Sequence, residues 1–173
     1  KEDFDALREL EKNAPAALSA ARSTAQSAGG RLDAAEASLS GLRQRYADSA
    51  LTQIADNIEQ ARQRLEFVDS AEETAQAKLD EGDTASAVVA VRAAEESVHQ
   101  ANVLLDAIEK TGRELDAARS ELQRAVADAR QDLAQARAFS ANGANAGLAG
   151  PMAGVEAALT AIERESSARN NPV

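Results

Sequence analysis

Small and apolar residues recur every seven positions through the second half of the sequence, and this spacing continues across a glycine. The row occupies positions 94, 101, 108, 115, 122, 129 and 136. A turn at Gly112 would normally reset the register, whereas a helix passes through a glycine at a cost of only about 1 kcal/mol relative to Ala. We therefore expect one helix from about Thr84 to about Phe139, roughly 84 Å long. The alternative is a kink, or two helices that meet near Gly112, because helices also bend at glycine.

The composition supports long helices once this period is taken into account. Leu, Ile, Val and Phe make up a little under a fifth of the 173 residues and the net charge is −10, a combination that by itself favours disorder. Ala, Glu, Leu, Arg and Lys together exceed half of the chain. Such a composition with a helical period is typical of long helices and coiled coils. The spacing therefore predicts an all-α chain.

Similar apolar stripes and the residues between them predict the domain organisation. We expect a short N-terminal helix over 1–13, a three-helix bundle over 14–110, an extension of the third helix over 111–139, a loop over 140–151, a short C-terminal helix over 152–168 and a frayed tail over 169–173. Within the bundle, Asn57 is expected to cap the second long helix after a connector that starts near Tyr46. Gly82 is expected to end that helix in a left-handed conformation.

Short connections make consecutive helices antiparallel neighbours. The segment lengths then predict an elongated, antiparallel three-helix bundle of the spectrin-like kind. Its long third helix overshoots the other two, and the short C-terminal helix folds back on the overhang. The seams are rich in Ala, which implies close helix approach and a thin core.

The residues expected of an enzyme or a metal site are missing or isolated. The sequence has one His and no Cys, so nucleophile–base pairs lack their usual members. Glu96 and His99 have the Glu-x-x-His spacing of di-iron bundles, but a single pair does not complete that site. The acidic segment 80–83 lacks the ligand pattern of an EF-hand, so helix capping is the simpler interpretation. We expect no catalytic activity, no metal and no cofactor.

The charge balance also limits the partners. An excess of acidic side chains disfavours nucleic acid and anionic membrane surfaces, which attract clustered Lys and Arg. Four aromatic residues are too few for base stacking. No apolar run approaches the roughly 18 residues of a membrane span. We therefore expect neither nucleic-acid binding nor direct membrane contact by this segment.

Arg119 interrupts an apolar row on the long third helix. Apart from Gly112, the other members of its seven-residue row are Val or Leu. Such an Arg either pairs with a facing carboxylate or lies along the edge of the seam with its head in water, and we favour the edge position. The exposed seam of the overhang, with Arg119, Val126 and Leu133, is the predicted interaction surface. It would serve a protein partner or self-association.

Three stretches carry a family resemblance: DFDALRELEKNAPAALSAARS, LRQRYADSALTQIADNIEQARQRLEF and LDEGDTASAVVAVRAAEESVHQANVLLDAIE. Together they resemble the C-terminal helical region of actinobacterial TPM domain-containing proteins. The likeness spans about residues 3–138 and is strongest in Tyr46–Leu65 and Leu79–Glu109. Ile58 stands where that family is expected to favour proline, a difference that affects helix capping.

The resemblance implies an architecture for the whole protein. By this resemblance, the whole protein is expected to have an exported N-terminal TPM domain, then one membrane span, and then this helical region on the cytoplasmic face of the membrane. The chain is then expected to be the soluble helical part of a membrane-anchored protein, with a role in interaction or spacing. The alternative is a helical ligand-binding bundle whose loop over 140–151 lids a pocket.

Overall fold

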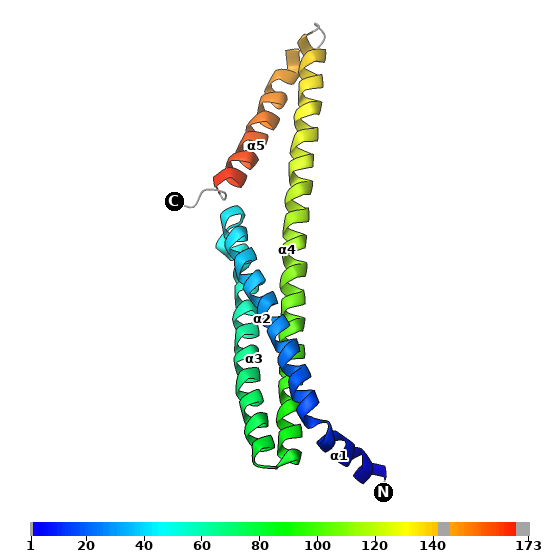
Figure 1. The fold of residues 1–173 in the computed structure, drawn as a ribbon. Helices are drawn as coiled ribbons and strands as arrows, with labels where there is room; N and C mark the ends of the chain where they lie inside the picture. The colour runs from blue at the N-terminus through cyan, green and yellow to red at the C-terminus, as the bar shows by residue number, and fades with distance from the viewer. Residues whose placement is uncertain (1, 142–145, 169–173) are drawn as a thin grey trace. The chain divides into compact units, whose positions relative to one another are not determined.

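Every regular element is helical in the computed structural model, which describes residues 2–141 and 146–168 (Figure 1). The elements are α1 (Glu2–Lys12), α2 (Ala14–Arg45), α3 (Asp48–Asp80), α4 (Thr84–Ala141), a 3-10 turn (Ala146–Leu148) and α5 (Ala149–Ala168). The all-α prediction is confirmed. The predicted tail over 169–173 lies outside the described residues.

The turn between α3 and α4 has the predicted left-handed glycine. Gly82 has a φ of +79° and is the one residue in the described ranges with a positive φ. The N–H of Gly82 donates to the carbonyl of Leu79 at 3.0 Å, and the N–H of Asp83 donates to that of Lys78 at 2.9 Å. These bonds satisfy carbonyls at the end of α3. Asp83 Oδ1 accepts the N–H of Ser86 at 3.1 Å and so caps α4.

The helix α4 runs without interruption for 58 residues, through Gly112. Gly112 does not have a left-handed backbone and lies inside the helix bounds of α4, so the predicted continuity is confirmed. A Cβ placed on Gly112 would lie 3.9 Å from Cδ1 of Leu42, an ordinary van der Waals contact. A methyl group therefore fits at this position, and the backbone conformation of Gly112 is one that alanine adopts.

The helix α3 begins earlier than the sequence predicted. It starts at Asp48, whereas we expected a connector up to Asn57. Leu51, Ile54 and Ile58 are all buried, and their spacing of three and four residues places them on one helix face. The apolar stripe therefore continues upstream of Asn57, and the residues taken for a connector form the first turns of the helix.

The loop predicted over 140–151 is also shorter in the structure. The helix α4 continues to Ala141, and α5 begins at Ala149 rather than at residue 152. Pro151 lies in the first turn of α5, where its missing N–H leaves no helical hydrogen bond unmade. Of the predicted loop, residues 142–145 lie outside the described ranges.

Two compact units divide the described chain. The first comprises the residues up to Ser40 together with Leu51–Lys110, and the second comprises Gly41–Ala50 together with the residues from Thr111 onward. The segment 41–50 thus belongs to the second unit, whereas the sequence placed it in the bundle over 14–110. The boundary on α4 falls between residues 110 and 111.

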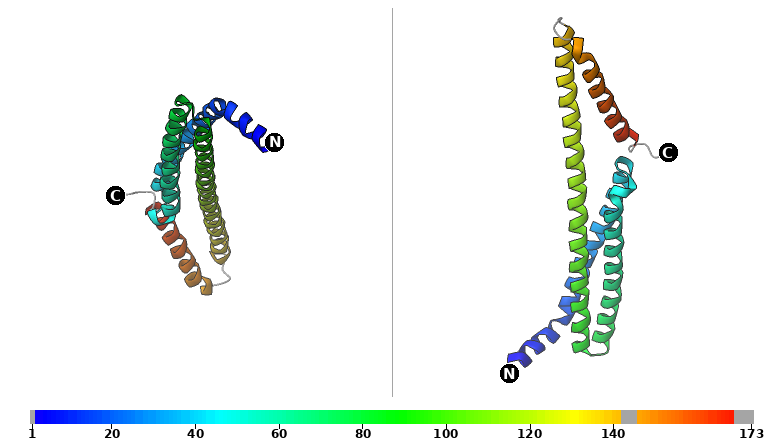
Figure 2. Two further views of the ribbon diagram at one scale, coloured as in Figure 1. Left: turned by 90° about the horizontal axis from the view of Figure 1, so that it is seen from below. Right: turned by 180° about the vertical axis from the view of Figure 1, so that it is seen from behind.

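The core of the first unit is formed by one face of each of α2, α3 and the first part of α4, which lie alongside one another (Figure 2). One cluster joins Ala28, Val68, Ala71, Ala94 and Val98. A second joins Leu18, Ala21, Ala75 and Val91. From the second cluster to the first, the residue numbers rise along α2 and along α4 but fall along α3. The helix α3 therefore runs antiparallel to the other two. Half or more of each cluster is Ala or Val, and small side chains let helices approach closely.

The second unit contains α5 beside the later part of α4. Arg130 pairs with Glu163 and Arg137 pairs with Glu156. The residue numbers of the α5 partners fall as those of the α4 residues rise, so the two helices are antiparallel. Leu133 of α4 and Leu159 of α5 are buried. The α5 helix is therefore held to α4 by a short apolar contact and by ion pairs.

Replacing Gly112 with Ala should stabilise the protein by roughly 0.5–1 kcal/mol. The substitution restores helix propensity and reduces the freedom of the unfolded chain, and the added methyl meets Leu42 without a clash. Urea denaturation measures the difference. Gly82→Ala is the matched control and should destabilise, because its positive φ is unfavourable for a residue with a Cβ. Destabilisation by Gly112→Ala would contradict the passage of α4 through Gly112 with ordinary helical dihedral angles.

Candidate functional site

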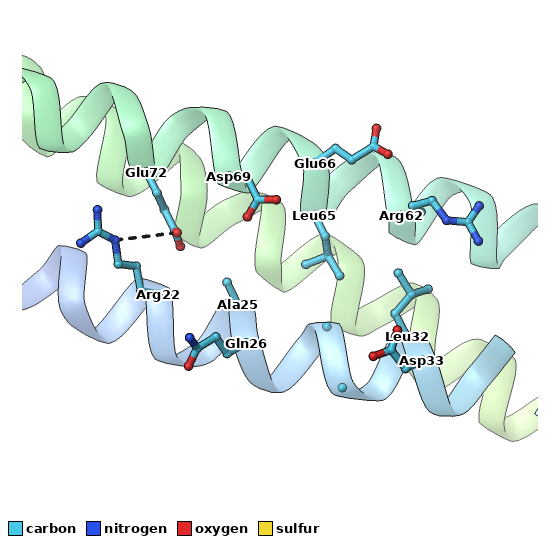
Figure 3. A pocket seen from close by; sticks show the side chains of 12 residues that line it. Arg22, Ala25, Gln26, Leu32, Asp33, Arg62, Leu65, Glu66, Asp69 and Glu72 are labelled. Atoms are coloured by element: carbon cyan, nitrogen blue, oxygen red, sulfur yellow. Dashed lines mark ion pairs between the residues drawn. The ribbon is translucent and has the colours of Figure 1, made fainter. Parts of the chain in front are cut away.

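Two grooves are candidates for a binding site, one in each unit. The first, the α2–α3 groove, has a volume of about 680 Å³ and lies between those two helices. Figure 3 shows Ala25 of α2 and Leu65 of α3 pointing into it. Gly29 and Gly30 also line it, and a Cβ on either would meet nothing within 4 Å. The glycine pair therefore widens this groove and is not required for close packing of the two helices.

The walls of the α2–α3 groove are predominantly acidic. Four carboxylate side chains line it against two arginines, at Asp33, Glu66, Asp69, Glu72, Arg22 and Arg62. Arg62 is already engaged, because its guanidinium donates to both Glu36 and Glu59. Arg22 lies 3.9 Å from Glu72, with most of the Glu72 side chain buried (Figure 3).

Glu72 is the unusual group of this groove. Its Oε1 atom is buried and has no hydrogen-bond partner. Burial raises the pKa of Glu72, the positive charge of Arg22 offsets part of this effect, and the negative charge of Asp69 adds to it. A carboxylate held in this way destabilises the folded state when it is ionised. The groove is thus an acidic surface with one poorly solvated carboxylate.

The second groove, the α4–α5 groove, has a volume of about 420 Å³ and an apolar floor. Leu122 and Val126 of α4 and Ile162 of α5 contribute the floor. Leu122 is 44% exposed and Ile162 is 37% exposed. Large aliphatic side chains of adjacent helices normally cover one another. Here they remain open to solvent along one side of the helix pair.

Arg119 borders the α4–α5 groove and lies near Tyr46. Its guanidinium carbon is 5.9 Å from the centre of the Tyr46 ring, within the range of a cation–π contact. Tyr46 donates its hydroxyl to Asp116 at 2.8 Å, and Arg45 lies 3.3 Å from the same carboxylate oxygen. Burial and this hydrogen bond raise the pKa of Tyr46. Among the described residues, no carboxylate pairs with Arg119, which is one of the residues that line the groove.

The other charged residues of this groove are paired. Arg130 donates to both carboxylate oxygens of Glu163, at 2.6 and 2.8 Å. This two-pronged geometry is the strongest that an arginine and a carboxylate form, and it lowers the pKa of Glu163. Hydrogen bonding from Arg137 likewise lowers the pKa of Glu156. These pairs set the position of α5 on α4 and leave Arg119 as the distinctive cation.

The residues predicted as an interaction surface have different environments in the structure. Arg119 and Val126 both line the α4–α5 groove. Leu133 is buried, so it supports the contact between α4 and α5 and offers little free surface. Sequence analysis missed Ile162 and Tyr46 as neighbours of Arg119. The apolar spacing of α5 contained a signal for Ile162, whereas no sequence signal placed Tyr46 beside Arg119.

The two motifs that were considered as possible metal sites make local contacts at helices. His99 is exposed, and Glu96 accepts a hydrogen bond from Gln100 at 3.0 Å. Asp80 accepts one from Gln76, also at 3.0 Å, and Asp83 is the cap described above. Within the described ranges no group of three or more His, Asp or Glu is placed to hold a metal ion. In the same ranges, no helix combines the length and apolar character of a membrane span.

Comparisons with known proteins give no further identification. The sequence matches no family model, and searches of curated proteins and of solved structures find no match either. Functional arguments therefore rest on the residues and the geometry of the two grooves.

Glu72→Gln should change how stability depends on pH. Because the folded pKa of Glu72 lies above its unfolded value, the folded state takes up the proton first as pH falls. The original chain therefore gains free energy of unfolding from this group as pH falls through the folded pKa, and Glu72→Gln lacks that gain. The variant should be the more stable at neutral pH, with an advantage that shrinks on acidification.

Urea denaturation at a series of pH values from neutral to about pH 4 covers this window. Glu73→Gln is the matched control, because Glu73 is the adjacent carboxylate and is exposed. The control should show no such convergence with the original chain. Stability curves of Glu72→Gln and the original chain that stay parallel across the series would refute the burial of the Glu72 charge.

Proposed function

We propose that this chain is a non-catalytic helical region that binds another protein through the α4–α5 groove. The observation that carries the proposal is the apolar floor of Leu122, Val126 and Ile162 beside Arg119, for which the described residues include no carboxylate partner. Protein interfaces combine an apolar centre with polar groups at the rim, and Arg is enriched in them. The groove offers both features on two adjacent helices.

The proposal includes the setting of the chain in a larger protein. The resemblance to TPM domain-containing proteins supports a membrane-anchored parent with this region at the cytoplasmic face. An elongated, spectrin-like arrangement with an overshooting third helix would suit a spacer. The helix lengths support it, since α4 has 58 residues against 32 in α2 and 33 in α3.

The competing function is a ligand-binding bundle. The α2–α3 groove favours it, because Glu72 has a buried oxygen without a hydrogen-bond partner that a cationic ligand would satisfy. The described residues that line the two grooves include none from the segment predicted as a lid over 140–151. A reproducible thermal shift with a small cation or metabolite would favour this function over protein binding.

A photo-crosslinking residue tests the proposed groove in cells that make the intact protein. Benzoylphenylalanine in place of Leu122 should capture a defined protein, because this position lies on the floor of the groove. The same residue in place of Val103 is the matched control, since Val103 is comparably exposed but lies in the first unit. Equal capture at the two positions, or none at either, would count against the groove as a protein-binding site.

A further inference from the structure

The helix α1 presents an apolar stripe whose first two residues are mostly exposed. Phe4 is 66% exposed and Leu7 is 54% exposed, and Leu10 continues the stripe at the same spacing of three residues. The guanidinium carbon of Arg8 lies 5.6 Å from the centre of the Phe4 ring. An 11-residue helix with such a stripe has the pattern of a segment that docks into a groove.

Acidic residues accompany this stripe on the same side of α1. Asp3 precedes Leu7 by four residues and Glu11 follows it by four, which places all three on one helix face. The helix as a whole has five acidic and two basic side chains, a net charge of −3. A surface that receives this face therefore needs both an apolar floor and a positive charge.

The α4–α5 groove has both of these properties. Leu122, Val126 and Ile162 form its floor, and Arg119 has no carboxylate partner among the described residues. Its lining contains two arginines and one glutamate, a net charge of +1 in a chain whose net charge is −10. The groove is thus a locally positive apolar site on an acidic protein. Its chemistry is complementary to that of α1.

We propose that α1 of one copy of this chain docks into the α4–α5 groove of a second copy. Phe4 and Leu7 cover Leu122 and Ile162, and Asp3 or Glu11 pairs with Arg119. The docked helix supplies a third helix to a site where α4 and α5 are otherwise two. This inference rests on the proposed function, because it assigns an occupant to the same groove.

The two surfaces are different, so the contact is heterologous. After one contact has formed, one copy retains a free groove and the other a free α1, so assembly continues until a ring closes or an open chain grows. The interface is small, since it is built on one short helix, and belongs to the weak and transient class. Association is therefore expected in the range of about 10–500 μM, where such contacts form.

Sedimentation equilibrium of the purified chain over this range tests the contact. The weight-average mass of the original chain should rise with concentration, with species larger than a dimer at the upper end. Phe4→Ala/Leu7→Ala and Leu122→Ala/Ile162→Ala should each remain monomeric throughout. Circular dichroism should show unchanged helicity, because all four positions are exposed. The control Phe67→Ala/Val103→Ala removes side chains of similar kind that are 52% and 53% exposed elsewhere, and it should associate like the original chain.

Mixing the two defective variants gives the sharpest result. The first variant retains its groove and the second retains its α1, so an equimolar mixture can form one contact per pair. The mixture should contain a 1:1 heterodimer and nothing larger. Arg119→Glu should abolish association of the original chain, and Asp3→Arg/Glu11→Arg on the partner copy should restore it in a mixture.

Three results would overturn the inference. They are a monomeric original chain throughout the range, association that survives either double substitution, and a mixture of the two variants that stays monomeric. If the chain is monomeric but benzoylphenylalanine at position 122 still captures a different protein, only the self-association proposal is wrong. Loss of that capture together with a monomeric chain would also end the proposed function.

Discussion

The unbroken backbone hydrogen bonding of α4 is the constraint on which the other helices depend. This one helix packs against α2 and α3 in the first unit and against α5 in the second. Its helical conformation continues along all 58 residues. Gly112 costs helix propensity, but it does not interrupt the helix.

The environment of a single row of α4 changes along the helix. Val98 and Leu105 are fully covered by the helices of the first unit, whereas Arg119 and Val126 are half-buried at the α4–α5 groove. Leu133 is buried again. The charged position of the row is therefore one that its neighbours leave half-buried.

Periodicity and capping chemistry predicted the helices well. The left-handed Gly82, the cap at Asp83 and the passage of α4 through Gly112 depend on neighbours within about five residues, which the sequence displays directly. The start of α3 was misplaced because Ser and Asn resemble caps even inside a helix. The apolar spacing of Leu51 and Ile54 was the stronger signal, and it was underused.

The grooves were much less predictable than the helices. The position of Arg119 in its row was visible, but Tyr46 and Ile162 meet it only through contacts between segments far apart in sequence. Likewise, no local pattern distinguishes Glu72 from Glu73, although only Glu72 has a buried oxygen without a partner. Helix formation is a local property, whereas the burial of one charge depends on which helix covers it.

Pulsed electron–electron double resonance between spin labels on either side of Gly112 tests the continuity of α4 most directly. The chain has no Cys, so spin labels can be attached at cysteines introduced by Val103→Cys and Arg124→Cys, two exposed positions of α4. A continuous helix separates their Cα atoms by about 32 Å, and the account predicts a single narrow distribution near that value. A markedly shorter or broad distribution would show that the helix bends or breaks at Gly112, and would contradict its continuity.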